Sequence, residues 1–262
     1  MTTITVGVLA LQGAFVEHIQ LLRRAAESIV QNGPRKALHE PPHFTFLEVR
    51  NTDELQACDA LILPGGESTS ISLIAERTAL LDPLRDFVKV QRKPVWGTCA
   101  GLILLAESAN KSKQSGQELI GGLDVRVQRN YFGRQVESFE ADLELPFLES
   151  PFHSVFIRAP VVEKVLPPSN AVPAENSPDQ VLAPPRQSTN APVEILGRLP
   201  GRARAIRDKT TTAEDLGEDG DIVAVKQGNV FGTAFHPELT GDERIHAWWL
   251  TEVVRLKSER IG

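Results

Sequence analysis

The sequence has only two cysteines, one methionine and one tyrosine among its 262 residues. With Cys58 and Cys99 alone, a framework of disulfides is excluded, and a reducing, cytoplasmic compartment is expected. No apolar run approaches the roughly 20 residues that span a bilayer. Residues 1–6 lead directly into a strand pattern, without the basic start and apolar core of a signal peptide. We therefore expect no membrane partner and no secretion.

Basic segments are also missing. The chain carries 28 Lys and Arg against 34 Asp and Glu, a formal charge of −6. It has no basic run and no basic stripe interleaved with aromatic residues, so a nucleic-acid partner is not expected. A hydrophobic content of 41% is enough for a proper core. We expect one domain over residues 1–262.

In the first hundred residues, short apolar runs alternate with segments of helical spacing. The runs predict strands at residues 4–11, 44–49, 60–63 and 94–96. The spacing predicts helices at residues 15–26, 70–76 and 83–91. Strands that alternate with helices form parallel sheets, and continuously apolar strands indicate a sheet covered on both faces. The sequence therefore predicts an α/β fold with a mostly parallel central sheet flanked by helices on both faces.

The second half predicts antiparallel additions to this sheet. Shorter strands are expected at residues 125–129, 139–142, 155–157, 161–165, 222–226 and 230–234, before a last helix at 242–256. Residues 227–229, Gln-Gly-Asn, mark a hairpin between the last two strands. Two segments, the proline-rich residues 167–192 and the charged residues 198–220, predict flexible surface insertions that carry no chemistry.

One cysteine lies where a strand should turn sharply into a helix. Residues 97–101 read Gly-Thr-Cys-Ala-Gly and stand between the apolar run 94–96 and the apolar residues 102–106. Glycines on both sides permit the tight turn, and a helix N-terminus favours the thiolate. Cys99 is therefore the predicted nucleophile, whereas Cys58 lies in an ordinary apolar context and is expected to be structural.

A cysteine nucleophile needs a base and a group that orients the base. His236 follows the apolar run 230–234, and Pro237 stiffens the backbone between it and Glu238. We expect Glu238 to accept a hydrogen bond from one ring nitrogen of His236 while the other nitrogen faces Cys99. The pattern assigns no role to the other histidines, His18, His39, His43, His153 and His246.

Attack on an amide also requires donors for the oxyanion that forms. The backbone N–H of Ala100, next to the nucleophile, is one candidate. The N–H of Gly66 is the other, in the Gly-Gly-Glu-Ser loop that follows the predicted strand 60–63. Because ligands bind beyond the carboxyl ends of parallel strands, we expect Gln12, this loop and Cys99 to converge on one crevice.

The motifs around Cys99 and His236 resemble those of the triad, or class I, glutamine amidotransferases. Further blocks occur in the expected order and are similar to the glutaminase subunits of pyridoxal 5′-phosphate synthase. These blocks are Leu-Gln-Gly-Ala at 11–14, Leu-Pro-Gly-Gly-Glu-Ser-Thr at 63–69, Arg-Asn-Tyr-Phe-Gly-Arg-Gln at 129–135, Ser-Phe-Glu-Ala-Asp at 138–142 and Phe-Ile-Arg-Ala-Pro at 156–160. They span most of the chain. The resemblance implies a single flavodoxin-like glutamine amidotransferase domain.

The resemblance also implies an activity: hydrolysis of L-glutamine to glutamate and ammonia. The ammonia would pass to a separate synthase subunit, in a hetero-oligomer that builds pyridoxal 5′-phosphate. Cys99, His236 and Glu238 would form the catalytic triad. The positions that match glutamine-binding residues are Gly66, Glu67, Ser68, Arg129, Ile157 and Arg158.

The charges of some of these residues suit particular groups of glutamine. Glu67 would meet the α-ammonium of glutamine, and an arginine its α-carboxylate. Gln12 would gate the oxyanion site or touch the synthase subunit. No metal or organic cofactor is implied, since pyridoxal phosphate would be the product of the complex.

Three alternatives remain open. The chain could be the glutaminase subunit of another amidotransferase, a cysteine hydrolase or peptidase on a similar sheet, or a non-catalytic binding module. The blocks at 129–135 and 138–142 argue against the first. Glu67 and Arg129, which suit the charged ends of a free amino acid, argue against the second. The complete set of Cys99, His236 and Glu238 argues against the third.

Overall fold

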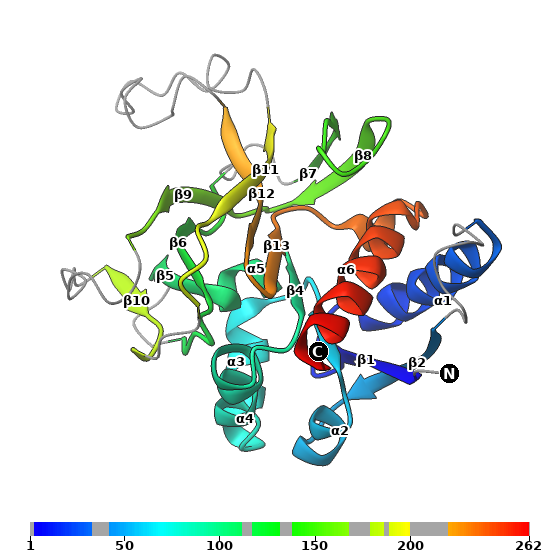
Figure 1. The fold of residues 1–262 in the computed structure, drawn as a ribbon. Coiled ribbons are helices and arrows are strands. Elements are labelled where there is room, and N and C mark those ends of the chain that lie inside the picture. Colours follow the sequence, from blue (N-terminus) through cyan, green and yellow to red (C-terminus); the bar gives the residue numbers. More distant parts are fainter. Residues whose placement is uncertain are drawn as a thin grey trace.

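The structure is a computed structural model that describes residues 3–32, 42–111, 117–131, 138–167, 179–185, 189–199 and 220–261. Helices surround a large twisted sheet, and a separate two-stranded hairpin extends from one end of it (Figure 1). The described strands of the large sheet follow the order β10-β5-β6-β9-β12-β13-β4-β3-β1-β2, and β11 pairs with β12. The predicted α/β fold class is therefore confirmed.

The parallel half of the sheet holds the deepest strands. Its members, in spatial order, are β2 (His43–Val49), β1 (Thr3–Leu9), β3 (Ala60–Leu63), β4 (Val95–Thr98) and β13 (Val230–Thr233). Every residue of β3, β4 and β13 is buried, as expected for a sheet with both faces covered. Their carboxyl ends all point to the same edge, which is where the predicted site residues begin.

The other half of the large sheet is mostly antiparallel. It consists of β5 (Ala106–Asn110), β6 (Leu123–Gln128), β9 (Val161–Val165), β10 (Gln180–Leu182), β11 (Glu194–Leu199) and β12 (Asp221–Gln227). Among these strands only β5 and β6 pair in parallel. The hairpin β7 (Ser138–Leu143) and β8 (Phe152–Ile157) forms the second sheet.

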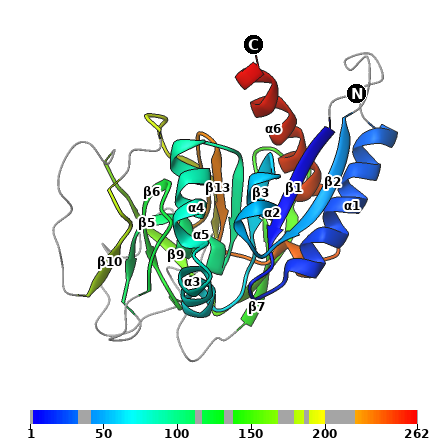
Figure 2. The same cartoon turned by 90° about the horizontal axis from the view of Figure 1, so that it is seen from below.

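Helices cover both faces of the parallel half. On one face α1 (Phe15–Asn32) packs beside α6 (Arg244–Ile261) (Figure 1). The other face carries α2 (Thr52–Gln56), α3 (Ser68–Arg77), α4 (Leu81–Arg85) and α5 (Ala100–Leu105), which contact one another (Figure 2). A π-helical turn, η1 (Asp86–Val90), extends α4. The 3₁₀ turn η3 (Pro237–Leu239) follows β13.

The two predicted insertions are only partly described. The described residues 179–185 of the proline-rich segment include β10, which pairs with β5 at the edge of the sheet. Strand β10 is not among the strands expected from the sequence, and its residues pair with β5 despite the prolines nearby. Strand β11 was not predicted, and Arg198, assigned to the charged loop, lies within it. Residues 168–178, 186–188 and 200–219 lie outside the described residues.

Other boundaries differ modestly. Helix α1 runs six residues beyond the predicted end at residue 26, and the predicted helix 83–91 is α4 followed by η1. Helix α2 was missed at sequence level, although Asn51 and Glu54 form a capping box at its start. Among the described residues, no helix combines the length and the hydrophobicity needed to cross a bilayer.

Candidate active site

Cys99 stands at a strained corner between β4 and α5. Its φ of 47° and ψ of −99° are unusual for a residue with a side chain, and its N–H donates to the Thr233 carbonyl of β13 at 2.8 Å. A Cβ on Gly101 would overlap the backbone of Leu63, so the turn requires glycine there. Because Ala100 is the first residue of α5, its N–H has no acceptor within the helix.

His236 and Glu238 meet beside this corner. His236 Nδ1 lies 2.7 Å from Glu238 Oε1, and the His236 N–H donates to the Val155 carbonyl of β8 at 2.8 Å. Burial by itself lowers the pKa of His236. Hydrogen bonds to Cys99 and to Glu238 outweigh it and raise this pKa to about 10. The imidazole is therefore protonated at neutral pH, between the sulfur and the carboxylate.

The surroundings of Glu238 keep it ionised. Burial acts to raise the pKa of this carboxyl, but His18 and His236 together hold it below the usual range. Cys99 is buried too, and its sulfur lies 3.9 Å from the Ile157 carbonyl at the end of β8. One sulfur, one imidazolium and one carboxylate thus follow one another in a buried row.

The loop after β3 lies directly against the imidazole. A Cβ on Gly65 would overlap the ring of His236, which leaves no room for a side chain. The Gly65 carbonyl accepts the Ala14 N–H at 3.1 Å. Because no peptide among the described residues is cis, the Gly66 N–H points away from Ala14. Gln12 Oε1 accepts the Glu67 N–H at 2.8 Å. The loop after β1 therefore holds the loop after β3 in place.

The predicted glutamine-binding residues differ in their contacts. The Glu67 carboxylate caps α3, accepting the Thr69 N–H at 3.1 Å and the Ser70 N–H at 2.7 Å. Burial would raise the pKa of Glu67, but a hydrogen bond from the Ser70 hydroxyl, together with these two N–H bonds, lowers it. Burial lowers the pKa of Arg129, and Glu67 opposes the shift, so the two charges interact. Ser68 is buried beneath them, and its hydroxyl lies 3.3 Å from Gln117 Oε1.

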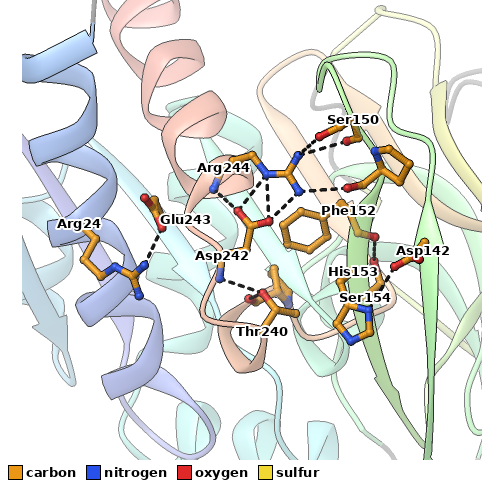
Figure 3. Close-up of polar contacts among 12 residues, drawn as sticks. Arg24, Asp142, Ser150, Phe152, His153, Ser154, Thr240, Asp242, Glu243 and Arg244 are labelled. Carbon is orange, nitrogen blue, oxygen red and sulfur yellow. Dashed lines mark hydrogen bonds and ion pairs between the residues drawn. The ribbon is translucent and has the colours of Figure 1, made fainter.

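The remaining two candidates, Ile157 and Arg158, end the hairpin β7–β8. Arg158 has a φ of 41°, another left-handed backbone beside the pocket. Arg244 anchors the start of β8. Its guanidinium donates to Ser150 Oγ at 2.7 Å and to the Pro151 carbonyl at 3.0 Å, and it pairs with Asp242 at 2.7 Å (Figure 3). The same hairpin holds His153, whose Nδ1 lies 3.2 Å from Asp142 Oδ1 on its exposed face.

Two buried histidines were not assigned from the sequence. His18 of α1 lies behind Glu238, with Nε2 3.4 Å from Glu238 Oε2. His246 of α6 touches His18, with 2.9 Å between His246 Nε2 and His18 Nδ1. Their neighbours in the sequence could have indicated their burial, because they lie beside apolar residues of each helix. These neighbours are Ile19 and Leu22 in α1, and Ile245 and Trp249 in α6. His39 lies outside the described residues, and His43 begins β2.

The second cysteine differs sharply from the first. Cys58 is buried, its thiol donates to the Glu54 carbonyl at 3.2 Å, and burial raises its pKa to about 12. A thiol that stays protonated is a poor nucleophile.

The fold and the pocket together define a class: an α/β protein whose strand-end cysteine is hydrogen-bonded to a buried His–Glu pair. Comparison with known sequences identifies the family. A profile of the SNO glutamine amidotransferase family matches residues 8–192 and 195–255. The chain belongs to this family.

Named relatives and a solved structure are similar over nearly the whole chain. An Arabidopsis thaliana protein described as probable pyridoxal 5′-phosphate synthase subunit PDX2 is 43% identical over 94% of this chain and 84% of its own length. Pyridoxal 5′-phosphate synthase subunit PdxT of Herpetosiphon aurantiacus is 38% identical over 94% and 98%. A crystal structure of a glutamine amidotransferase is 36% identical, covers 95% of this chain and 98% of its own, and superimposes with a TM-score of 0.63.

Proposed function

We propose that the protein hydrolyses L-glutamine and supplies the ammonia to a pyridoxal 5′-phosphate synthase. The observation that carries this proposal is the row of Cys99, His236 and Glu238 at the carboxyl edge of the sheet. Its family and the names of its relatives give the substrate and the product of the complex.

The chemistry begins with the paired thiol and imidazole. His236 holds the proton of the Cys99 thiol, and the sulfur attacks the side-chain amide carbon of glutamine. The N–H groups of Gly66 and Ala100 stabilise the oxyanion. His236 then gives its proton to the departing nitrogen, which leaves as ammonia, and a γ-glutamyl thioester remains on Cys99. Water, deprotonated by His236, cleaves the thioester and releases glutamate.

The substrate would be held by the residues around the pocket. Glu67 and Arg129 present one charge of each sign, which suits the two ends of a free amino acid. Because the Glu67 carboxylate already caps α3, it would meet the α-ammonium through its remaining lone pairs. Gly66 and Ser68 would line the same side of the substrate, and Ile157 and Arg158 would close the site from the hairpin.

Two further parts of the proposal concern the complex with the synthase subunit and its location in the cell. The synthase subunit would form a hetero-oligomer with this chain and receive ammonia without its release to solvent, and Gln12 would lie near the contact. The cytoplasm is the expected location, because both cysteines are free thiols and the nucleophile must stay reduced. We also retain a single domain with surface insertions as part of the proposal.

The test uses two nitrogen sources. The purified chain is mixed with a cognate synthase subunit and with pentose and triose phosphates, and pyridoxal phosphate is measured with glutamine or with an ammonium salt. We expect the Cys99→Ala complex to use ammonium as well as wild type does and to make no product from glutamine. Glutamine-dependent synthesis by Cys99→Ala would contradict the proposal. Peptide cleavage without glutamine hydrolysis by wild type would favour the cysteine hydrolase instead.

A further inference from the structure

A chain of buried polar groups continues beyond the triad. Glu238 Oε1 is bonded to His236, but Oε2, also buried, has no hydrogen bond among the described residues. His18 Nε2 lies 3.4 Å from this oxygen and 3.2 Å from Thr98 Oγ1. His18 Nδ1 in turn meets His246 Nε2 at 2.9 Å. Both outer histidines are completely buried.

Both outer rings are neutral. Burial lowers the pKa of His18 to about 3, although Glu238 opposes the shift, and burial lowers the pKa of His246 to about 3. The groups that face His18 are Glu238 from η3, His246 from α6, His236 beyond the carboxylate, and Thr98 and Trp96 from β4. A neutral imidazole has one N–H, so each ring must choose which nitrogen carries it.

One choice of tautomer suits the buried surroundings better than the other. With the proton on Nε2 of both rings, His246 donates to His18 Nδ1, and His18 Nε2–H faces Thr98 Oγ1 at 3.2 Å, with Glu238 Oε2 3.4 Å from the same nitrogen. The bare nitrogen left over is His246 Nδ1, which has no partner among the described residues. The opposite choice would aim the lone pair of His18 Nε2 at a buried carboxylate and bury an unpaired N–H on His246, and both are costly.

This arrangement matters when the proton of His236 leaves. While His236 is an imidazolium, it balances the charge of Glu238. Once His236 has protonated the departing ammonia, Glu238 becomes a buried carboxylate between neutral groups, where an N–H donor is worth most. His18 supplies that donor from the side opposite His236.

We propose that His18 is a positioning residue for glutamine hydrolysis, which donates its Nε2–H to Glu238, and that His246 fixes the tautomer of His18. The inference rests on the proposed function. It extends the row to five groups: the Cys99 thiol, His236, Glu238, His18 and His246. Neither outer ring touches substrate or exchanges a proton during the reaction.

The test compares three replacements of His18, assayed for glutamine hydrolysis in the complex with the synthase subunit. His18→Phe keeps the ring volume and removes the donor, and we expect kcat to fall about 10- to 100-fold with little change in KM. His18→Gln places an amide N–H near the position of Nε2, and its kcat should return to within about threefold of wild type. His18→Asn places its amide near Nδ1 instead and should not restore kcat.

Two measurements separate positioning from simple packing. Cys58→Ala, a buried change away from the pocket, should lower Tm without lowering kcat. In wild type labelled with ¹⁵N-histidine, NMR should show two rings that stay neutral in the Nε2–H tautomer between pH 6 and 8. Equal losses of kcat in His18→Phe and His18→Gln, wild-type kcat in His18→Phe, or the Nδ1–H tautomer on His18 would each overturn the inference. If wild type itself hydrolyses no glutamine, the proposed function fails instead.

Discussion

Glu238 joins two histidines with opposite protonation. The pKa of His236 is raised because a sulfur and a carboxylate lie on its two sides, so this ring is protonated. The pKa of His18 is lowered because burial dominates, so this ring stays neutral. The same side chain type therefore acts as a charged acid in one place and as a neutral donor in the other. The sequence predicts the first pair, since His236 and Glu238 are two residues apart. It does not predict the second, whose members are 220 positions apart and meet only when α1 packs beside η3.

The charge of His236 sets the pH range of activity. With its pKa raised to about 10, the ring keeps the proton that the leaving ammonia needs until the pH approaches that value. We expect kcat/KM for glutamine to stay level through neutral pH and to fall along an alkaline limb near pH 10. An alkaline limb near pH 6.5, the ordinary pKa of histidine, would contradict this assignment. The measurement is a pH profile of ammonia release from pH 6 to 11.

His236 also contributes to stability with a defined sign. Because its pKa is higher in the folded state, its contribution is complete below pH 6.5 and disappears as the pH rises through about 10. Between pH 7 and pH 10.5, the Tm of wild type should therefore fall relative to the Tm of His236→Phe.

At the scale of elements, the strand-to-helix corner and the loop after β3 are the parts that the sequence predicts well. Glycines flank Cys99, and paired glycines follow β3. The tight turns at both places are therefore indicated by the residue types alone. Strands β10 and β11 could not be predicted in this way, because distant pairing with β5 and β12 orders them. Strand β5 could not be predicted for a different reason: it follows α5 directly, without a turn signal between them.

Gly65 is the position where backbone and base come closest. In Gly65→Ala the new methyl would push the His236 ring aside, and a displacement of about 1 Å can cost about 100-fold in rate. We expect kcat to fall by about that factor. Gly241→Ala serves as the control, because the Cβ added there meets no atom within 4 Å, although Gly241 has a positive φ of 72° that an alanine would strain. Similar loss of kcat in both variants would show that the overlap with His236 is not responsible.

The hairpin β7–β8 depends on Arg244. In Arg244→Lys the forked contacts to Ser150, Pro151 and Asp242 cannot all be kept (Figure 3). We expect a rise of about 3- to 10-fold in KM for glutamine, because Ile157 and Arg158, which we propose to close the substrate site, lie at the other end of β8. The measurement is a steady-state titration with glutamine.

Arg24→Ala is the matched control for this change. Arg24 pairs with Glu243, the residue next to Arg244, but reaches no part of the hairpin (Figure 3). An exposed pair of this kind contributes about 0–1 kcal/mol, so KM and Tm should hardly change. Equal changes of KM in the two variants would contradict a special role of Arg244 in holding the hairpin.

At the scale of the whole molecule, the parallel sheet is what brings the site together. The order β1-β3-β4-β13 places Gln12, Gly66, Cys99 and His236 at one edge, although they span more than 220 positions of the sequence. Alternating strands and helices predict that convergence. They do not predict that α1 and α6 lie side by side on one face and bury a histidine each behind the triad.

The buried pair His18 and His246 also governs the response of the whole fold to acid. Both pKa values fall from 6.5 to about 3 on folding, so the unfolded chain binds more protons than the folded one in that window. Stability should therefore decrease as the pH falls from about 6.5 towards 3, by up to about 1.4 kcal/mol per pH unit for each histidine. Denaturant unfolding across this range checks it, and His246→Phe should show a shallower loss than wild type.

The central claim is that Cys99 alone attacks glutamine. The most direct measurement treats the full-length protein, in complex with the synthase subunit, with an electrophilic diazoketone analogue of glutamine and then maps the adduct by mass spectrometry. We predict one adduct, on Cys99, that forms in step with the loss of glutamine hydrolysis, is slowed by excess glutamine, and leaves Cys58 unmodified. Complete loss of glutamine hydrolysis with the adduct on any other residue, or hydrolysis that persists with Cys99 fully modified, would contradict the account.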